Sequence, residues 1–399
     1  MKDKKSITLC AAFMASTMAL SAQNTAAVAD GTYTGTWAAA AEWTGKGDMP
    51  KMSLAGNTLR EIIQVSIGGD ELQLQLSNEF SKEPLEIAGI YVADALDSCD
   101  IERKTVKELK FAGQKAVTIA PGQTVMSDAF KYSLRPRQRL AVTICYGQTV
   151  PVNMTSHRGS RTTSFIAKGT VAAKKKFIAA EKLEHWYNIA QLNVRTNGGV
   201  KAVAVLGNSI TDGRGSTTNM QNRWPDMMAA KMDCAVLNLG IGGNCVVQGG
   251  LSEPAMKRFD RDILGQKGVS TLIIFQGTND IGTSHHAEKS AKDLIEAYKK
   301  LIKKAHDAGI KTVYGATITA FKGNAWYSPY HEAARQEVNE WIRNGGEFDA
   351  LIDFDKLTRD PSDPEKLKKE LTDDWLHLNA EGYRVMGEYA AEIVKGNNK

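Results

Sequence analysis

The hydrophobic rhythm of the chain changes near Gly199, and this change constrains the fold more than any other feature. Before it, apolar and polar residues alternate with period two, most strictly in "ELQLQLS" at Glu71–Ser77. Such alternation is typical of strands with one buried face, and turn signals such as "GGD" and "PGQ" separate the runs. This segment has no long amphipathic helical pattern, so it predicts an antiparallel β-sandwich domain over residues 31–176.

After Gly199 the apolar residues form continuous runs, namely "VKAVAVLG", "CAVLNLG", "VSTLIIFQG" and "KTVYGATI". Strands that are buried on both faces have this composition. Helical patterns alternate with them, and residues 287–308 carry a clear apolar stripe. The alternation predicts an α/β domain with a parallel sheet over residues 199–399. Residues 177–198 are then expected to be the linker.

The N-terminus has the pattern of a signal peptide. A basic start, "MKDKK", precedes the short apolar run "SITLCAAFMASTMALSA". Cleavage is expected after Ala22, with Ala29 as the alternative. The run is shorter than the roughly 20 apolar residues of a membrane anchor. We therefore expect export to the periplasm or the outside of the cell, without stable membrane insertion.

Charge and cysteine content limit the partners. The net charge of +5 is small for 399 residues and is spread along the chain, which argues against a nucleic-acid partner. The mature chain keeps Cys99, Cys145, Cys234 and Cys245. None has zinc-ligand spacing, so no metal site is expected. Whether these cysteines form disulfides or are buried thiols is left open, as is the oligomeric state.

Small polar residues and glycines follow three of the predicted parallel strands. "GNSITDG" brings Ser209, "NLGIGGN" brings Gly240, Gly242 and Gly243, and "FQGTNDIG" brings Asn279. The carboxyl ends of parallel strands meet at one edge of a sheet, where ligands bind in open α/β folds. The sequence therefore predicts a single site built from these loops.

A fourth segment, "DDWLH", places Asp374 three residues before His377. A serine hydroxyl is a weak nucleophile at neutral pH and needs a general base. His377 is expected to take the proton of Ser209, and Asp374 to orient the imidazole. The alternatives are that Ser209 is a helix N-cap and that Asp374 and His377 cap the last helix.

Acyl transfer also needs donors for the oxyanion. The backbone N–H groups of Ser209 and Gly243 and the side-chain amide of Asn279 are the candidates, with Gly240 or Gly242 as replacements for Gly243. The alternatives are that the glycines only make a tight turn and that Asn279 bonds its own backbone.

Together the four blocks "GNSITDG", "NLGIGGN", "GTND" and "DDWLH" resemble those of the SGNH hydrolases, also called GDSL esterases and lipases. The resemblance implies a flavodoxin-like three-layer α/β/α fold. It also implies a Ser209–His377–Asp374 triad, an oxyanion hole completed by Gly243 and Asn279, and no cofactor.

The longer pattern "SITDGRGS…NRWPD" is similar to one subgroup of that family. The subgroup has an N-terminal β-domain and includes xylan-cluster acylhydrolases or arylesterases of rumen and gut bacteria. One residue departs from the family pattern, because Asn208 stands where aspartate usually precedes the serine. Asparagine is nearly isosteric and can still accept a hydrogen bond, so activity is expected to survive.

Four further residues are candidate substrate contacts, although such residues more often pack loops. They are Arg214, Arg223 and Trp224, which follow the predicted nucleophile, and His157 in the β-domain. Arginine can bind hydroxyl or carboxylate groups, and tryptophan can stack on a sugar.

The predicted function is a secreted serine esterase that removes O-acyl groups, chiefly acetyl, from a plant polysaccharide such as xylan. Its expected partner is thus an acylated carbohydrate or a small ester. One alternative is a lipase or phospholipase with the same mechanism. Another is a non-catalytic flavodoxin-like or carbohydrate-binding protein, although neither phosphate-binding motif, G-x-x-x-x-G-K-[ST] or G-x-G-x-x-G, is present.

Overall fold

The computed structural model describes residues 32–171, 176–196 and 199–397. The predicted signal peptide, with its ends at Ala22 or Ala29, lies outside these residues. From Thr32 onward the chain forms one compact unit. No helix in the described part is both long enough and apolar enough to span a bilayer.

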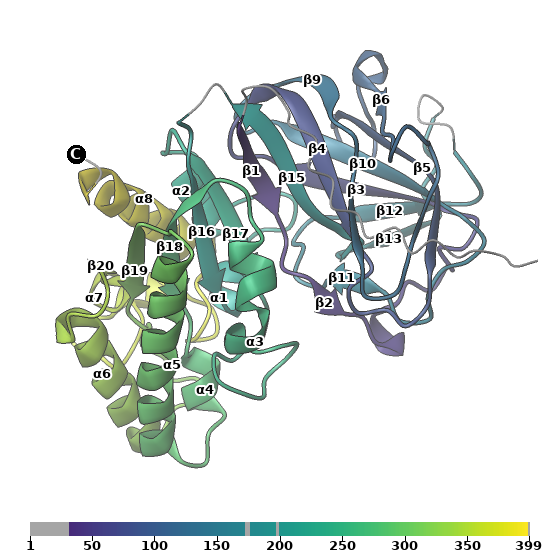
Figure 1. The fold of residues 1–399 in the computed structure, drawn as a ribbon. Coiled ribbons are helices and arrows are strands. Elements are labelled where there is room, and N and C mark those ends of the chain that lie inside the picture. The colour runs from purple at the N-terminus through teal and green to yellow at the C-terminus, as the bar shows by residue number, and fades with distance from the viewer. Residues whose placement is uncertain (1–31, 172–175, 197–198, 398–399) are drawn as a thin grey trace, which may run out of the picture. The chain divides into compact units, whose positions relative to one another are not determined.

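The first part of this unit is built from antiparallel strands, as the period-two pattern predicts (Figure 1). The strands are β1 (Thr32–Ala38), β2 (Glu42–Trp43), β3 (Thr58–Gln64), β4 (Gly69–Ser77), β5 (Leu85–Asp94), β6 (Lys107–Glu108), β7 (Val117–Ile119), β8 (Thr124–Met126), β9 (Phe130–Leu134), β10 (Arg139–Tyr146), β11 (Thr155–His157), β12 (Ser164–Ala167), β13 (Glu181–Leu183), β14 (Trp186–Tyr187) and β15 (Ile189–Thr196). Short 3₁₀ turns occur at Lys46–Asp48 and Arg103–Thr105.

These strands form three sheets. One has the order β1-β15-β4-β8 with β9 on β4, and a second has the order β13-β12-β3-β10-β5-β6 with β7 on β5. A small third sheet joins β14, β11 and β2. The packing of the two larger sheets as a sandwich stays a prediction.

The prediction that residues 177–198 form a linker is wrong. Strands β13, β14 and β15 of the antiparallel part lie in this segment. Strand β15 pairs with both β1 and β4 and is therefore central to its sheet. The sequence pattern did not reveal this, since the partner β1 lies at the far end of the antiparallel part. The remaining domain boundaries stay predictions.

The second part is an alternation of parallel strands and helices, as the continuous apolar runs predict. Its strands are β16 (Ala202–Gly207), β17 (Ala235–Gly240), β18 (Val269–Phe275), β19 (Thr312–Ala316) and β20 (Ala350–Ile352). Its helices are α1 (Ser209–Asp212), α2 (Trp224–Ala229), α3 (Ala255–Phe259), α4 (Thr278–Gly282), α5 (Ala287–Asp307), α6 (Pro329–Asn344), α7 (Phe354–Thr358) and α8 (Ala380–Asn397), with a π-helical turn at Asp260–Leu264 and a 3₁₀ turn at Lys369–Leu371.

All neighbours in this sheet are parallel, and the strand order is β17-β16-β18-β19-β20. This is the 2-1-3-4-5 order of flavodoxin-like folds. The three-residue strand β20 is absent from the sequence prediction, because so short a run carries no readable period.

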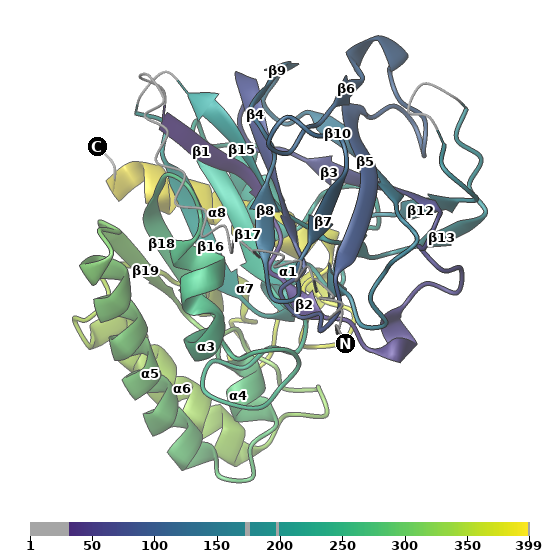
Figure 2. The same ribbon diagram turned by 45° about the vertical axis from the view of Figure 1, so that its right-hand side comes forward.

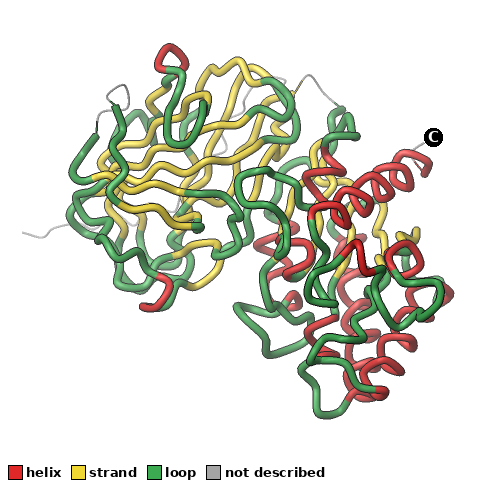
Figure 3. Tube along the Cα trace, turned by 180° about the vertical axis from the view of Figure 1, so that it is seen from behind, coloured by secondary structure: helices red, strands yellow, loops and turns green. Residues whose placement is uncertain are grey.

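Both faces of the parallel sheet are covered by helices. On β16, Ala204 and Leu206 join the core beneath α3, α5 and α6. Val203 and Val205 point to the opposite face and join the core beneath α2, α7 and α8. Figure 2 shows α5 and α6 side by side, and in Figure 3 the helices lie around this second part, apart from the two short 3₁₀ turns of the antiparallel part.

One of the apolar cores, the one that includes Ala204 and Leu206, runs through both parts. It includes Trp37 on β1, Leu72 on β4 and Leu237 on β17. Strand β1 approaches the edge strand β17, and the N–H of Gly35 donates to the carbonyl of Lys267 at 2.9 Å. A Cβ at Gly35 would lie 3.0 Å from the Leu237 side chain, so glycine permits this close approach.

The four cysteines of the predicted mature chain, Cys99, Cys145, Cys234 and Cys245, are free thiols in the structure. Cys145 and Cys245 are buried. The question that the sequence left open is thus answered in favour of thiols.

Candidate active site

Ser209 is the first residue of α1, directly after strand β16. Asn208 precedes it with extended backbone, and the Asn208 side-chain oxygen accepts a hydrogen bond from the Ile210 N–H at 3.0 Å. Gly213, with φ of 95°, ends the helix after one turn. Asparagine therefore supplies the N-cap that starts this turn, and the amide oxygen suffices without the negative charge of aspartate.

The structure brings Ser209, His377 and Asp374 together. Ser209 Oγ lies 2.9 Å from His377 Nε2, and His377 Nδ1 lies 2.7 Å from Asp374 Oδ2. The second oxygen of Asp374 accepts the backbone N–H groups of His377 and Leu376, at 2.7 and 3.0 Å. Because a carboxylate only accepts, Nδ1 carries the hydrogen and Nε2 faces the serine as an acceptor.

The environment keeps this histidine basic but uncharged. Burial lowers the pKa of His377 below 6.5, and the positive charges of Arg214 and Arg161 lower it further, against the opposing effect of Asp374. Burial alone would raise the pKa of Asp374, but the hydrogen bonds and charge of His377 hold it below its ordinary value. At neutral pH the pair is therefore a neutral imidazole beside a carboxylate.

Three hydrogen-bond donors lie around the same space. Ser209 opens α1, so its N–H has no acceptor within the helix. Gly243 has φ of 68°, and no described residue accepts its N–H. Asn279, on α4, donates one amide hydrogen to the carbonyl of Asn244 at 2.6 Å, and this bond orients its side chain. The second amide hydrogen remains available as a donor to a bound ligand.

Gly243 is held in this position by its neighbours. Its carbonyl accepts the Leu251 N–H at 2.8 Å, and a Cβ at residue 243 would lie 2.9 Å from the Leu251 side chain. Gly240 allows close packing, because a Cβ at this position would overlap the backbone nitrogen of Asp212. Gly242 lines the cleft beside Gly243.

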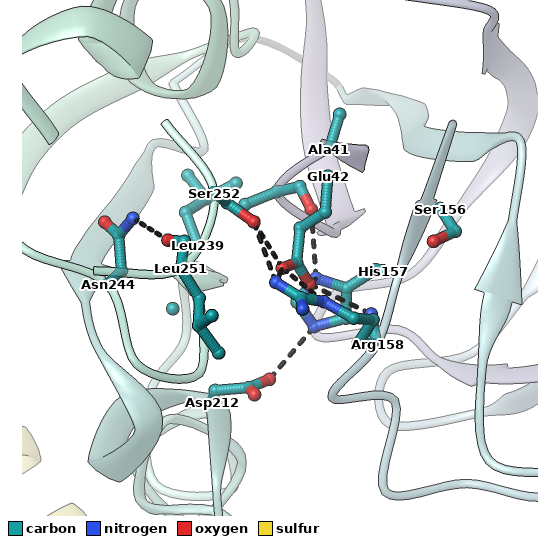
Figure 4. Close-up of polar contacts among 12 residues, drawn as sticks. Ala41, Glu42, Ser156, His157, Arg158, Asp212, Leu239, Asn244, Leu251 and Ser252 are labelled. Carbon is teal, nitrogen blue, oxygen red and sulfur yellow. Dashed lines mark hydrogen bonds and ion pairs between the residues drawn. The ribbon is translucent and has the colours of Figure 1, made fainter. Parts of the chain in front are cut away.

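The sequence prediction missed Asn244, which organises the loop after β17. Its side-chain oxygen accepts from Arg258 Nε at 3.0 Å and from Gln276 Nε2 at 2.8 Å. Its amide donates to the carbonyl of Leu251 (Figure 4) and to that of Glu253, both at 2.8 Å. The sequence signal that could have identified Asn244 is its position directly after the two glycines of "NLGIGGN".

A cleft of about 770 Å³ opens over these groups. One wall comes from the parallel part and includes Ser209, Gly243, Asn279 and His377. The other comes from the antiparallel part, with the charged residues Glu42, Arg158 and Arg161 and with Gly159.

The predicted substrate contacts separate into two groups. Arg214 lines the cleft and is exposed. Trp224 is fully buried, packs on Phe275 and Phe354, and does not line the cleft. Arg223 is buried in a capping interaction with Asp226. This placement does not support substrate contact by Trp224 or Arg223, because both pack beneath the loops.

His157 also lies behind the cleft wall and not in it. It is 4% exposed, and its Nε2 lies 2.9 Å from Asp212 Oδ1, three residues after Ser209 (Figure 4). Its neighbour Glu42 accepts from Arg158 Nη2 and from Ser252 Oγ, both at 2.6 Å. These bonds connect the antiparallel part to both loops of the site, so His157 contacts the loop of the candidate nucleophile.

Within the described residues, no group of three or more His, Cys, Asp or Glu side chains is arranged to hold a metal ion.

Residues 205–385 match the model of the GDSL-like Lipase/Acylhydrolase family. The matched segment holds strands β16 to β20 and all the residues of the candidate site that belong to the parallel part. This part of the chain has the SGNH hydrolase fold, and the protein is a carboxylic ester hydrolase. No curated protein is similar enough to count as a match.

Several solved structures are similar at low identity. A GDSL-like lipase from Bacteroides thetaiotaomicron is 18% identical, with a TM-score of 0.38 over 49% of this chain and 89% of its own. A carbohydrate acetylesterase from Sinorhizobium meliloti is 15% identical, with a TM-score of 0.39 over 49% of this chain and 99% of its own. A family two carbohydrate esterase from Clostridium thermocellum is 12% identical, with a TM-score of 0.40 over 90% of this chain and 99% of its own.

Proposed function

We propose that the protein is an exported serine esterase that removes O-acyl groups, chiefly acetyl, from an acylated carbohydrate. The observation that carries this proposal is the continuous hydrogen-bonded line from Ser209 Oγ through His377 to Asp374. Serine is activated as a nucleophile in this way on many unrelated folds.

In the first half of the reaction, Ser209 Oγ attacks the ester carbonyl carbon while its proton passes to His377 Nε2. The carbonyl oxygen becomes an oxyanion and accepts hydrogen bonds from the N–H groups of Ser209 and Gly243 and from the Asn279 amide. The bond to the leaving oxygen then breaks, and His377 returns its proton to the departing alcohol. The product is an acyl-enzyme on Ser209.

In the second half, His377 takes a proton from a water molecule, and the resulting hydroxide attacks the acyl carbon. The same donors stabilise the second oxyanion. When the bond to Ser209 breaks, His377 returns the proton to Oγ and the free acid leaves. Asp374 stabilises the imidazolium in both halves without taking its proton.

The nature of the cleft supports a polar substrate over a long-chain lipid. Its walls carry charged side chains on both sides, among them Glu42, Arg158, Arg214 and Asp374. A long acyl chain would need an extended apolar channel. The sequence resemblance favours acetylated xylan as the specific substrate. The proposal that the protein is exported depends on the signal-peptide pattern of the first 22 residues.

The test is release of acetate from acetylated xylan and from short-chain and long-chain aryl esters, compared for the wild type and Ser209→Ala. We expect hydrolysis of short esters and acetylated xylan, and a loss of at least about a thousandfold in Ser209→Ala. Ser216→Ala, a nearby serine outside the cleft, is the matched control. Full activity of Ser209→Ala would exclude the mechanism, and a preference for long chains would exclude the substrate class.

A further inference from the structure

We infer that the substrate carries a carboxylate near its ester group, and that Arg161 and Arg214 bind this anion, so that the enzyme deacylates an acidic sugar. This inference rests on the proposed function, because it names the substrate class of the same site. It follows from the pairing of the charged groups around the cleft.

Each carboxylate that lines the cleft already has a partner other than these two arginines. Glu42 receives two bonds from the Arg158 guanidinium, at 2.6 and 3.0 Å. Asp374 is bonded to His377 at 2.7 Å. The third carboxylate, Asp212, is bonded to His157 at 2.9 Å.

The Asp212 charge is neutralised because His157 is an imidazolium. Its Nδ1 lies 2.9 Å from the Ala40 carbonyl and its Nε2 lies 2.9 Å from Asp212 Oδ1. Both oxygens only accept hydrogen bonds, so both ring nitrogens carry hydrogen. Burial alone would lower the pKa of His157, but the charges of Asp212 and Glu42 and the two bonds raise it overall.

Arg161 brings a second positive charge to Asp212, because its Nη2 forms an ion pair with Asp212 Oδ2 at 3.6 Å while His157 bonds Oδ1. One carboxylate thus faces two cations, and one positive charge is left in excess at the cleft. The Arg161 side chain lines the cleft and is 28% exposed, so its guanidinium is open to a bound carboxylate. The guanidinium can bind such a group through two parallel hydrogen bonds.

The loop that carries Arg161 is built to hold it there. A Cβ at Gly159 would overlap the Asp212 carboxylate, so only glycine lets the loop approach this closely. Arg161 itself has φ of 48°, a strained conformation for a residue with a side chain. The Asn219 N–H fixes it by donating to the Arg161 carbonyl at 2.9 Å. Strain of this kind persists where the surroundings impose it.

Arg214 supplies the second cation from the parallel part. It is exposed, lines the cleft, and its guanidinium makes no hydrogen bond or ion pair with another described residue. Arg214 and Arg161 line the same cleft as Ser209 and His377, and the lowered pKa of His377 agrees with positive charges in its neighbourhood. An anion bound between them would thus lie close to the ester.

The experiment measures acetate release from three matched sugars: an O-acetylated methyl glucuronide, its methyl-esterified uronate and the O-acetylated methyl glucoside. O-acetylated N-acetylneuraminic acid is added as a second acidic sugar. The assays are run at about pH 7, where His377 with its lowered pKa is mostly neutral and the raised pKa of His157 favours the imidazolium. We expect kcat/KM for at least one acidic sugar to exceed that of its neutral counterpart by about ten- to hundredfold.

The variants Arg161→Gln and Arg214→Gln are expected to lower this acid-to-neutral ratio, and Arg214→Lys to retain part of it. Arg214 is exposed, so its variants keep the test valid if Arg161→Gln does not fold. Arg103→Gln is the matched control, because it removes the same charge from a 3₁₀ turn outside the cleft, and it should leave the ratio unchanged.

Equal rates on the acidic and neutral sugars would overturn the inference while leaving the esterase proposal intact. A ratio that both glutamine variants leave unchanged would overturn it as well. If no ester of any kind is hydrolysed, the proposed function fails first and this inference fails with it.

Discussion

The two walls of the cleft come from parts of the chain with different architecture and different tasks. In the parallel part, Ser209 and Asn279 lie in the short helices α1 and α4 that follow strands, and His377 lies in the loop before α8. In the antiparallel part, Glu42 and His157 lie on the short strands β2 and β11 and are buried. The comparison indicates that the parallel part supplies the candidate catalytic residues. The antiparallel part supplies charged side chains that bind the loops holding those residues.

The strongest test of this comparison separates the two parts. A fragment of residues 199–399 would expose the core that Leu237 shares with Trp37 and the edge strand β17. We expect it to fail to fold, because exposed apolar cores and open strand edges favour aggregation. Circular dichroism and size-exclusion chromatography of the fragment are the measurements. A soluble, cooperatively unfolding and active fragment would show that the antiparallel part is only an accessory.

Removing the buried imidazolium tests the charged contact between the parts. His157→Leu removes the hydrogen-bonded partner of Asp212 and a positive charge beside Glu42, and we expect a loss of about 3–5 kcal/mol in the free energy of unfolding. Urea denaturation measures it. The exposed His286, whose side chain makes no capping bond, provides the control His286→Leu, which should change stability by less than about 0.5 kcal/mol.

The same variant has a pH signature. Because the folded-state pKa of His157 is raised, its stabilising contribution is complete below the unfolded value of 6.5 and is lost as the pH rises through the folded value. The difference between wild type and His157→Leu should therefore shrink at alkaline pH. A difference that does not change with pH would mean that His157 acts through packing alone.

On the parallel side, Asn279→Ala tests the oxyanion donors. We expect kcat to fall by about a hundred- to thousandfold with little change in KM, because the donor acts mainly in the transition state. Initial-rate kinetics on a short aryl ester measure this. Asn344→Ala, at the exposed end of α6, should leave kcat unchanged. An effect of Asn279→Ala on KM alone would assign the residue to substrate binding.

The smallest expected effect concerns the pH dependence of catalysis on the parallel side of the cleft. Hydrolysis needs neutral His377, so kcat/KM should fall only as the pH drops through a pKa below 6.5. Arg214 lowers this pKa, and Arg214→Met should therefore move the acidic limb to higher pH. A pH–rate profile on a neutral ester is the measurement. A limb that stays in place would show that solvent screens the Arg214 charge.

Much of the parallel part was predictable from sequence. Continuous apolar runs marked β16 to β19, the apolar stripe marked α5, and polar residues after these strands marked the candidate site. Local patterns succeed here because each strand is followed along the chain by its own loop. The failures have a common cause: the segment 177–198 and the packing of Trp224 depend on partners that are far away in the sequence.

The sequence by itself determined the strand types, the parallel sheet and the four loops that hold Ser209, Gly243, Asn279 and His377, since these follow from local composition and from the geometry of strand ends. Only the tertiary structure decided that His157 and Arg161 both face Asp212, which leaves one positive charge in excess at the cleft. Charge pairing depends on distances of a few ångströms between residues from different sheets, and no pattern along one chain segment encodes such distances.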